Sequence, residues 1–91
     1  MTDPLAPLRA RFRDRTRSDL ARFRTLVAGD LGCDELKRLV HGLAGAAGTF
    51  GYPALSQAAM VLDDRYVAGG VPDAAELDRL ERAMVEVAEA D

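Results

Sequence analysis

His41 is the only histidine of the 91-residue chain, and it lies in a segment with the periodicity of an amphipathic helix, about residues 33–50. At about 100° per residue the apolar side chains of this segment fall on one face, and His41 lies about 160° from the centre of that face. The apolar residues are Leu36, Leu39, Val40, Leu43, Ala46, Ala47 and Phe50. The spacing therefore predicts an imidazole exposed to solvent, where it can act as a nucleophile or a proton carrier near neutral pH.

Three glycines follow His41 in the same predicted helix: Gly42, Gly45 and Gly48. Gly45 and Gly48 come four and seven residues after His41, which places them on the same outer face. Each glycine within a helix costs up to about 1 kcal/mol relative to alanine, so three together cost roughly 2–3 kcal/mol. Most histidines in proteins have no chemical role, but such a role-free histidine would not explain the glycines on the surface around it. We therefore expect a partner that approaches the helix backbone closely beside His41.

The composition favours a single helical domain. The chain is 48% hydrophobic and 30% charged but only 5% aromatic, a mixture that supports a packed core and favours helices over a β-sandwich. A single cysteine, Cys33, excludes an internal disulfide and any multi-cysteine metal site. No second histidine follows His41 at the i+4 position, so no metal site is predicted. No apolar run reaches the roughly 20 residues of a membrane span, and no signal-peptide segment is present, so we expect a cytoplasmic protein without membrane association.

Turn-forming residues divide the chain into four predicted helices. Clusters of glycine and proline occur at residues 29–32, 51–53 and 69–72. The helices between them extend over about residues 5–28, 33–50, 53–68 and 73–90. Because the linkers are short, neighbouring helices are expected to be antiparallel. The expected fold is all-α, an antiparallel four-helix bundle that forms one domain, residues 1–91.

Local patterns predict the helix ends and the core faces. Pro53 favours the first position of the third helix, and Asp73 with Glu76 has the capping-box spacing at the start of the fourth. Thr16 and Asp19 interrupt the apolar face of the first helix, which predicts a partly exposed stretch or a bend there. The core residues expected outside the second helix are Leu5, Leu8, Phe12, Phe23, Leu26, Val27, Leu55, Ala58, Ala59, Leu62, Tyr66, Leu77, Leu80, Met84, Val87 and Ala88.

Charge is unevenly distributed along the chain, although the net charge is only −3. Residues 1–24 contain seven arginines and three aspartates, whereas residues 73–91 contain seven acidic residues and two arginines. This asymmetry indicates either an anionic partner for the basic segment or two oppositely charged helices that are neighbours or simply solvated. The arginines alternate in sequence and spread around the helix without an aromatic platform, so we expect no nucleic-acid binding.

Residues 40–51, VHGLAGAAGTFG, resemble the signature of histidine-containing phosphotransfer (HPt) domains. The family pattern is a histidine, two residues, usually a lysine, then a glycine, small residues, an apolar residue and a glycine. Residues 58–63, AAMVLD, are similar to the family's following helix, which ends in leucine and an acidic residue. The resemblance is strong over the second and third helices, and the other two match only in length and pattern.

The resemblance implies a phosphocarrier that is not an enzyme. A receiver domain or a hybrid sensor histidine kinase would phosphorylate His41 on Nε2, and the group would then pass to an aspartate of a response-regulator receiver domain. The Mg²⁺ would come from the partner receiver, and the carrier would need no cofactor of its own. Because 91 residues leave no room for a kinase or receiver segment, a stand-alone protein is expected. Asp63 matches the family's acidic residue that accepts the Nδ1–H of the histidine, and the alternative is an ordinary surface acid.

One departure from the family pattern concerns the position of the usual lysine, which is Ala44. Either the cation is dispensable, or Lys37 and Arg38, one turn before His41, replace it. The expected receiver-docking surface comprises Gly42, Gly45, Gly48, Lys37, Arg38 and Ala44, together with Met60 and Val67 on the non-core side of the third helix and Ser56 between them. The loss of the lysine also leaves an alternative open, a docking module that binds a receiver or kinase without carrying phosphate. The presence of His41 and Asp63 argues against that alternative.

Overall fold

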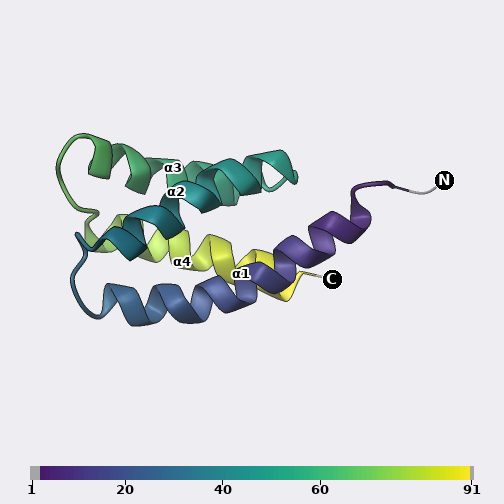
Figure 1. The fold of residues 1–91 in the computed structure, drawn as a ribbon, viewed down its shortest axis with the longest axis horizontal. Coiled ribbons are helices and arrows are strands. Elements are labelled where there is room, and N and C mark those ends of the chain that lie inside the picture. Colours follow the sequence, from purple (N-terminus) through teal and green to yellow (C-terminus); the bar gives the residue numbers. More distant parts are fainter. Residues whose placement is uncertain (1–2, 91) are drawn as a thin grey trace.

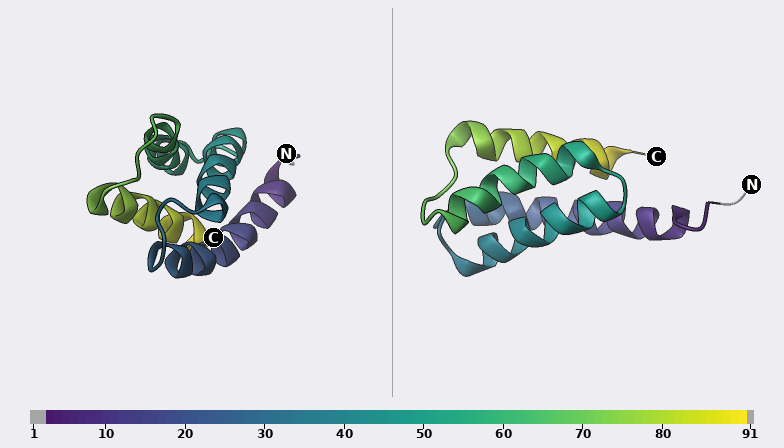
Figure 2. Two further views of the ribbon diagram at one scale, coloured as in Figure 1. Left: turned by 60° about the vertical axis from the view of Figure 1, so that its left-hand side comes forward. Right: turned by 90° about the horizontal axis from the view of Figure 1, so that it is seen from above.

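In the computed structural model, which describes residues 3–90, the chain forms four α-helices. They are α1 (Ala6–Val27), α2 (Asp34–Thr49), α3 (Pro53–Val67) and α4 (Ala74–Glu89), each inside the range expected from the sequence. Consecutive helices pack side by side, and α4 returns to pack against α1 (Figures 1 and 2). Residues 1–2 and 91 of the expected domain lie outside the described residues. The predicted all-α, antiparallel four-helix bundle is confirmed.

The helix ends have the local chemistry that the sequence predicts. At the start of α4, the Asp73 carboxylate accepts a hydrogen bond from the backbone N–H of Glu76 at 2.8 Å. The Glu76 carboxylate in turn accepts one from the backbone N–H of Asp73 at 2.9 Å, which completes the capping box. Gly51 and Gly69 end the preceding turns with φ of 85° and 87°, a backbone conformation that glycine adopts without a steric penalty. These local features fix the positions at which α3 and α4 begin.

The core lies between the four helices. Its fully or nearly buried apolar residues are Phe12, Leu20, Phe23, Leu36, Val40, Leu43, Ala47, Leu55, Ala58, Ala59, Leu62, Leu80, Ala83, Met84, Val87 and Ala88. Leu26, Val27, Leu39, Ala46, Phe50, Tyr66 and Leu77 are half-buried at its edge. The core residues predicted for α2, α3 and α4 therefore all lie in or against the core, and most of the other residues of these helices are exposed.

The stretch of α1 around Thr16 differs from the expectation. Thr16 is completely buried, and its hydroxyl donates a hydrogen bond of 2.8 Å to the carbonyl of Phe12. Because that bond satisfies the hydroxyl, the polar residue can face the core, and α1 continues as one helix. Asp19 is only 20% exposed and pairs with Arg15. The predicted exposed stretch is therefore wrong, and Leu20, absent from the predicted apolar face, is buried there instead.

The first turns of α1 extend past the other helices. Figures 1 and 2 show the N-terminal end of α1 projecting beyond the bundle, and the molecule measures 46 × 22 × 20 Å. Leu5 and Leu8, which were expected in the core, are 42% and 41% exposed because no other helix covers them. The expectation that the apolar face of α1 is buried over its whole length is wrong at this end.

The basic α1 and the acidic α4 are neighbours. Arg24 of α1 pairs with Glu81 of α4 at 3.6 Å, and the Nε of Arg17 donates to the carbonyl of Ala88 at 2.8 Å. The interpretation in which the two oppositely charged helices are neighbours is confirmed, and an anionic partner for the basic segment stays a prediction. Among residues 3–90, no helix combines the length and the apolar composition needed to cross a lipid bilayer.

Candidate phosphoacceptor surface

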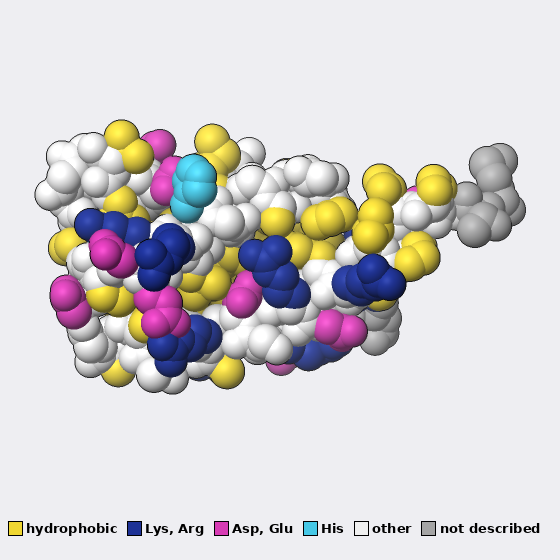
Figure 3. All heavy atoms as spheres, viewed as in Figure 1, with side chains coloured by type: hydrophobic (Ala, Val, Ile, Leu, Met, Phe, Trp, Pro, Cys, Tyr) yellow, Lys and Arg dark blue, Asp and Glu magenta, His cyan; other side chains and the backbone are white. Residues whose placement is uncertain are grey.

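His41 lies near the middle of α2 and points away from the core. Its side chain is 77% exposed, and Figure 3 shows the imidazole on the outer surface of the bundle. Asp63 of α3 faces it, with both carboxylate oxygens 3.3 Å from Nδ1. The side chain of Asp63 is only 25% exposed, so it is held between the two helices. The structure thus brings together two residues that are 22 positions apart in the sequence.

The contact with Asp63 is compatible with one of the two neutral forms of the imidazole. A carboxylate can only accept hydrogen bonds, so the contact is a hydrogen bond when Nδ1 of His41 carries the proton. In the neutral ring, Nε2 then keeps its lone pair. Because the two ring nitrogens lie on different edges of the imidazole, Nε2 is directed away from Asp63 and toward solvent. The arrangement can present an oriented nitrogen nucleophile to a partner.

Ser56 of α3 forms a close contact with α2, although the sequence placed it on the outer side of its helix. It is 9% exposed, and its hydroxyl donates a hydrogen bond of 2.8 Å to the carbonyl of Ala44. A Cβ atom on Gly48 would lie 3.2 Å from the Ser56 Oγ. Gly48 is exposed, but its contact with Ser56 gives it a packing reason to lack a side chain, so this glycine is explained without a docked partner.

The other two glycines of α2 have different surroundings. A Cβ atom on Gly42 would lie 3.5 Å from the Nη2 of Arg15, so this glycine faces α1. Gly45 is exposed, and no atom lies within 4 Å of its Cβ position. Of the three glycines near His41, Gly45 alone is as open as the sequence predicts, and its absent side chain has no packing explanation within the bundle.

The two basic residues that precede His41 face different ways. The ammonium of Lys37 lies 5.8 Å from the ring centroid of Tyr66, on the side of α2 that faces α3. Arg38 is exposed and, at about 100° per residue, lies about 60° from His41 on the opposite side. The prediction that both residues compensate for the missing lysine therefore involves two separate parts of the surface.

The remaining predicted docking residues lie at different depths. Ala44 is half-buried and packs against the core. Met60 and Val67 of α3 are exposed, at 50% and 82%. Val67 is the last residue of α3, one turn beyond Asp63. Docking by these residues stays a prediction.

The chain that carries this surface matches a known protein family. A family model described as the Hpt domain matches residues 7–90, nearly the whole chain. The chain belongs to the Hpt domain family. Hpt domains carry phosphoryl groups on histidine in phosphorelays, act as phosphocarriers rather than enzymes, and interact with receiver domains and kinases. No curated protein and no solved structure matches the chain.

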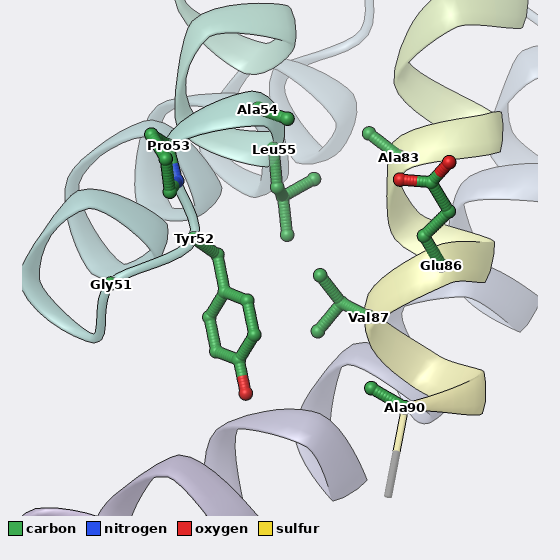
Figure 4. A pocket seen from close by; sticks show the side chains of 9 residues that line it. All are labelled: Gly51, Tyr52, Pro53, Ala54, Leu55, Ala83, Glu86, Val87 and Ala90. Atoms are coloured by element: carbon green, nitrogen blue, oxygen red, sulfur yellow. The ribbon is translucent and has the colours of Figure 1, made fainter.

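This Hpt domain also has a small apolar pocket, which is separate from the histidine. The pocket has a volume of about 200 Å³ and lies between the α2–α3 turn and the last turns of α4. Figure 4 shows its lining, residues 51–55 together with Ala83, Glu86, Val87 and Ala90. None of the predicted site residues lines it. Within residues 3–90, no group of three or more His, Cys, Asp or Glu side chains could hold a metal ion. The chemistry of His41 therefore belongs to an open surface rather than to a cavity.

Two contacts near His41 were not predicted from the sequence. The hydrogen bond from Ser56 depends on the rotation of α3 about its axis, which the apolar pattern defines only approximately. The position of Arg15 beside Gly42 depends on how α1 packs against α2. Arg15 is one of seven arginines in the first 24 residues, and no local signal distinguishes it from the others.

Proposed function

We propose that this Hpt domain accepts a phosphoryl group on Nε2 of His41 and passes it to an aspartate of a response-regulator receiver domain. The donor is the aspartyl phosphate of a receiver domain or a hybrid sensor histidine kinase. The observation that carries the proposal is the contact between Asp63 and Nδ1 of an imidazole that is 77% exposed. A nucleophile that must meet an aspartyl phosphate on another protein needs both the exposure and the orientation.

The proposed transfer from a receiver requires little chemistry from the carrier. The lone pair of Nε2 attacks phosphorus, the bond from phosphorus to the aspartyl oxygen breaks, and the carboxylate leaves with the electron pair. The proton on Nδ1 stays in place, and the Asp63 carboxylate faces the imidazolium that results. Mg²⁺ bound by the receiver would neutralise charge on the phosphoryl oxygens. The second transfer restores the neutral imidazole, so the domain acts as a carrier without a cofactor of its own.

The surface around His41 supports docking of a partner of this kind. Gly45, one turn after the histidine, leaves the backbone of α2 open to close approach. On the α3 side, Met60 adds a side chain that is half exposed and apolar. A receiver domain can therefore cover the imidazole without displacing any side chain at Gly45. Action as a stand-alone, cytoplasmic protein stays a prediction from the sequence.

A docking module that does not carry phosphate is the second candidate. The observation that favours it is Ala44, which is half-buried at the position of the family's usual lysine and offers no charge to a phosphoryl group. The His41–Asp63 contact favours the carrier, because a module that only docks has no need of an oriented imidazole.

The deciding experiment uses a receiver domain labelled with ³²P on its aspartate. After incubation with this Hpt domain, we expect a labelled product that is stable in base and labile in acid, as phosphohistidine is. His41→Gln should keep the helical far-UV circular dichroism of the wild type and accept no label. Label retained on His41→Gln would contradict the assignment of His41. Complex formation with the receiver but no label on the wild type would establish the docking module instead.

A further inference from the structure

The surface of α2 around His41 has two flanks with different surroundings. We call the first the α3-facing flank, defined by Lys37, Ala44 and Gly48, which contact Tyr66 and Ser56 of α3. We call the second the α1-facing flank, defined by Arg38, Gly42 and Gly45. At about 100° per residue, these three lie about 60°, 100° and 40° from His41 on the side away from Asp63. Arg15 of α1 joins this flank through its contact with Gly42.

The orientation of the imidazole determines which flank a phosphoryl group would meet. Nδ1 of His41 is directed at Asp63, which belongs to α3. Nε2 lies on the other edge of the ring, so a phosphoryl group bonded to it extends away from α3. The α1-facing flank lies on the side of His41 away from Asp63, whereas the ammonium of Lys37 lies over the Tyr66 ring on the α3 side. Figure 3 shows Lys and Arg side chains below the imidazole, toward α1, with Asp and Glu side chains among them.

Arg15 is held in a way that leaves part of its guanidinium for an anion. Its Nε pairs with the carboxylate of Asp19, one turn further along α1, at 3.4 Å. Its Nη2 lies against the backbone of Gly42, the residue next to His41, 3.5 Å from the Cβ position. The side chain is 54% exposed, so its Nη groups can swing toward a phosphoryl group on His41. A Cβ atom on Gly42 would make only an ordinary van der Waals contact with this guanidinium.

We propose that Arg15 and Arg38 bind the phosphoryl group on His41 and supply, from the α1-facing flank, the positive charge missing at Ala44. This inference rests on the proposed carrier function. A phosphoryl group has a charge of about −1.5 to −2 near pH 7, and the planar guanidinium offers it two parallel N–H donors. In this arrangement the cation comes from a neighbouring helix and from the residue one turn before the histidine, instead of the residue one turn after it.

The test uses potassium phosphoramidate, a small anionic donor that needs no receiver domain. Nε2 of His41 attacks phosphorus, the P–N bond breaks, and the nitrogen leaves as ammonia with the electron pair. The initial rate is measured by ³¹P NMR of the phosphohistidine signal. We expect Arg15→Gln and Arg38→Gln each to lower the rate about two- to fivefold, which corresponds to the strength of exposed charge interactions. Arg15→Lys should recover most of the loss, because it restores the charge.

Arg24→Gln is the matched control. Arg24 lies on the same helix and is 54% exposed like Arg15, but it pairs with Glu81 across the bundle. Its variant should react at the wild-type rate. In about 1 M salt, where the screening length falls to about 3 Å, Arg15→Gln and the wild type should react at the same rate. If the Arg15→Gln variant reacted slowly because its structure was damaged, adding salt would not remove the difference in rate.

Three results would overturn the inference while leaving the carrier function intact. They are a wild-type rate for both Arg15→Gln and Arg38→Gln, an equal loss in Arg15→Lys and Arg15→Gln, and an equal loss in the Arg24→Gln control. If wild-type His41 takes no phosphoryl group from either phosphoramidate or a labelled receiver, the carrier function fails and this inference fails with it. The wild-type reaction thus separates the two failures.

Discussion

Gly48 of α2 and Ser56 of α3 pack so closely that a Cβ atom on the glycine would lie 3.2 Å from the serine Oγ. The same hydroxyl donates to the carbonyl of Ala44, one turn earlier in α2. Glycine at position 48 therefore permits the approach of the two helices, whereas at Gly45 no neighbour explains it. The glycines that follow the histidine are chemically identical, but the fold gives them different roles.

The first prediction concerns the coupling between Gly48 and Ser56. Gly48→Ala gains up to about 1 kcal/mol of helix propensity, but the new methyl group presses on the Ser56 hydroxyl. In the Ser56→Ala background that contact is relieved, so Gly48→Ala should be more favourable there by about 0.5 kcal/mol or more. Urea unfolding of the wild type, both single variants and the double variant measures this coupling. Equal effects of Gly48→Ala in the two backgrounds would show that the contact has no energetic consequence.

The second prediction concerns Gly45, which has open space at its Cβ position. Gly45→Ala and Gly45→Gln should both raise the free energy of unfolding, by a few tenths to about 1 kcal/mol, because glycine is a poor helix former. Gly45→Gln should nevertheless slow phosphoryl transfer from a receiver domain strongly, since its side chain occupies the docking surface. Gly45→Ala is the matched control with the smallest side chain and should slow transfer less. Transfer at the wild-type rate in Gly45→Gln would contradict docking at this residue.

The fold could be predicted from the sequence because its signals are local. Glycine and proline mark the turns, and the apolar period defines the inner face of each helix, so the bundle follows from segments of a few residues. The error at Leu5 and Leu8 has a geometric origin. At 1.5 Å per residue, the 22 residues of α1 span about 33 Å and the 16 of α2 about 24 Å, so one end of α1 has no neighbour. The error at Thr16 arose because a hydroxyl that bonds to the carbonyl four residues earlier can be buried.

The candidate site was only partly predictable, because some of its features depend on contacts between helices and not on local sequence signals. The exposure of His41 is a property of α2 alone, so the helical period was enough to predict it. The approach of Asp63 joins two helices, and its expectation rested on the resemblance to a family. Arg15 reaches α2 through the packing of α1, and nothing in the sequence distinguishes it from Arg13 or Arg17.

The third prediction separates orientation from chemistry at Asp63. With the carboxylate 3.3 Å from Nδ1, the neutral imidazole of His41 should carry its proton on Nδ1 and leave Nε2 bare. Asp63→Asn removes the negative acceptor, so the Nε2–H form should become more populated and transfer should slow without being abolished. The ¹⁵N shifts of the ring at high pH report the tautomer. Asp64→Asn, the neighbouring residue on α3, is the control. Identical tautomer populations in the wild type and Asp63→Asn would make Asp63 an ordinary surface acid.

The last prediction concerns the pH dependence of stability at Asp19, the carboxylate that holds Arg15. Burial raises the pKa of the Asp19 carboxyl above its ordinary value of 3.8, and the attraction of Arg15 offsets this only in part. Between the ordinary and the raised pKa the folded protein binds more protons than the unfolded chain, so its stability falls as pH rises through that window. Above the raised pKa, the stability contributed by the protonated Asp19 carboxyl is lost completely. Asp19→Asn removes the charge at nearly constant size, so it should be at least as stable as the wild type at pH 7, with a difference that shrinks in acid.

Glu35 provides a control of opposite sign for this experiment. A hydrogen bond from Arg22 lowers the pKa of the Glu35 carboxyl, so that group stabilises the fold above its unfolded pKa and loses the effect as pH falls through its folded pKa. Glu35→Gln should therefore be less stable than the wild type at pH 7 and approach it in acid. Urea unfolding of both variants between pH 3 and pH 8, about the range in which carboxylates titrate, measures the two trends. An Asp19→Asn variant that is less stable than the wild type at pH 7, like Glu35→Gln, would show that the pairing of Asp19 with Arg15 outweighs the burial of its charge.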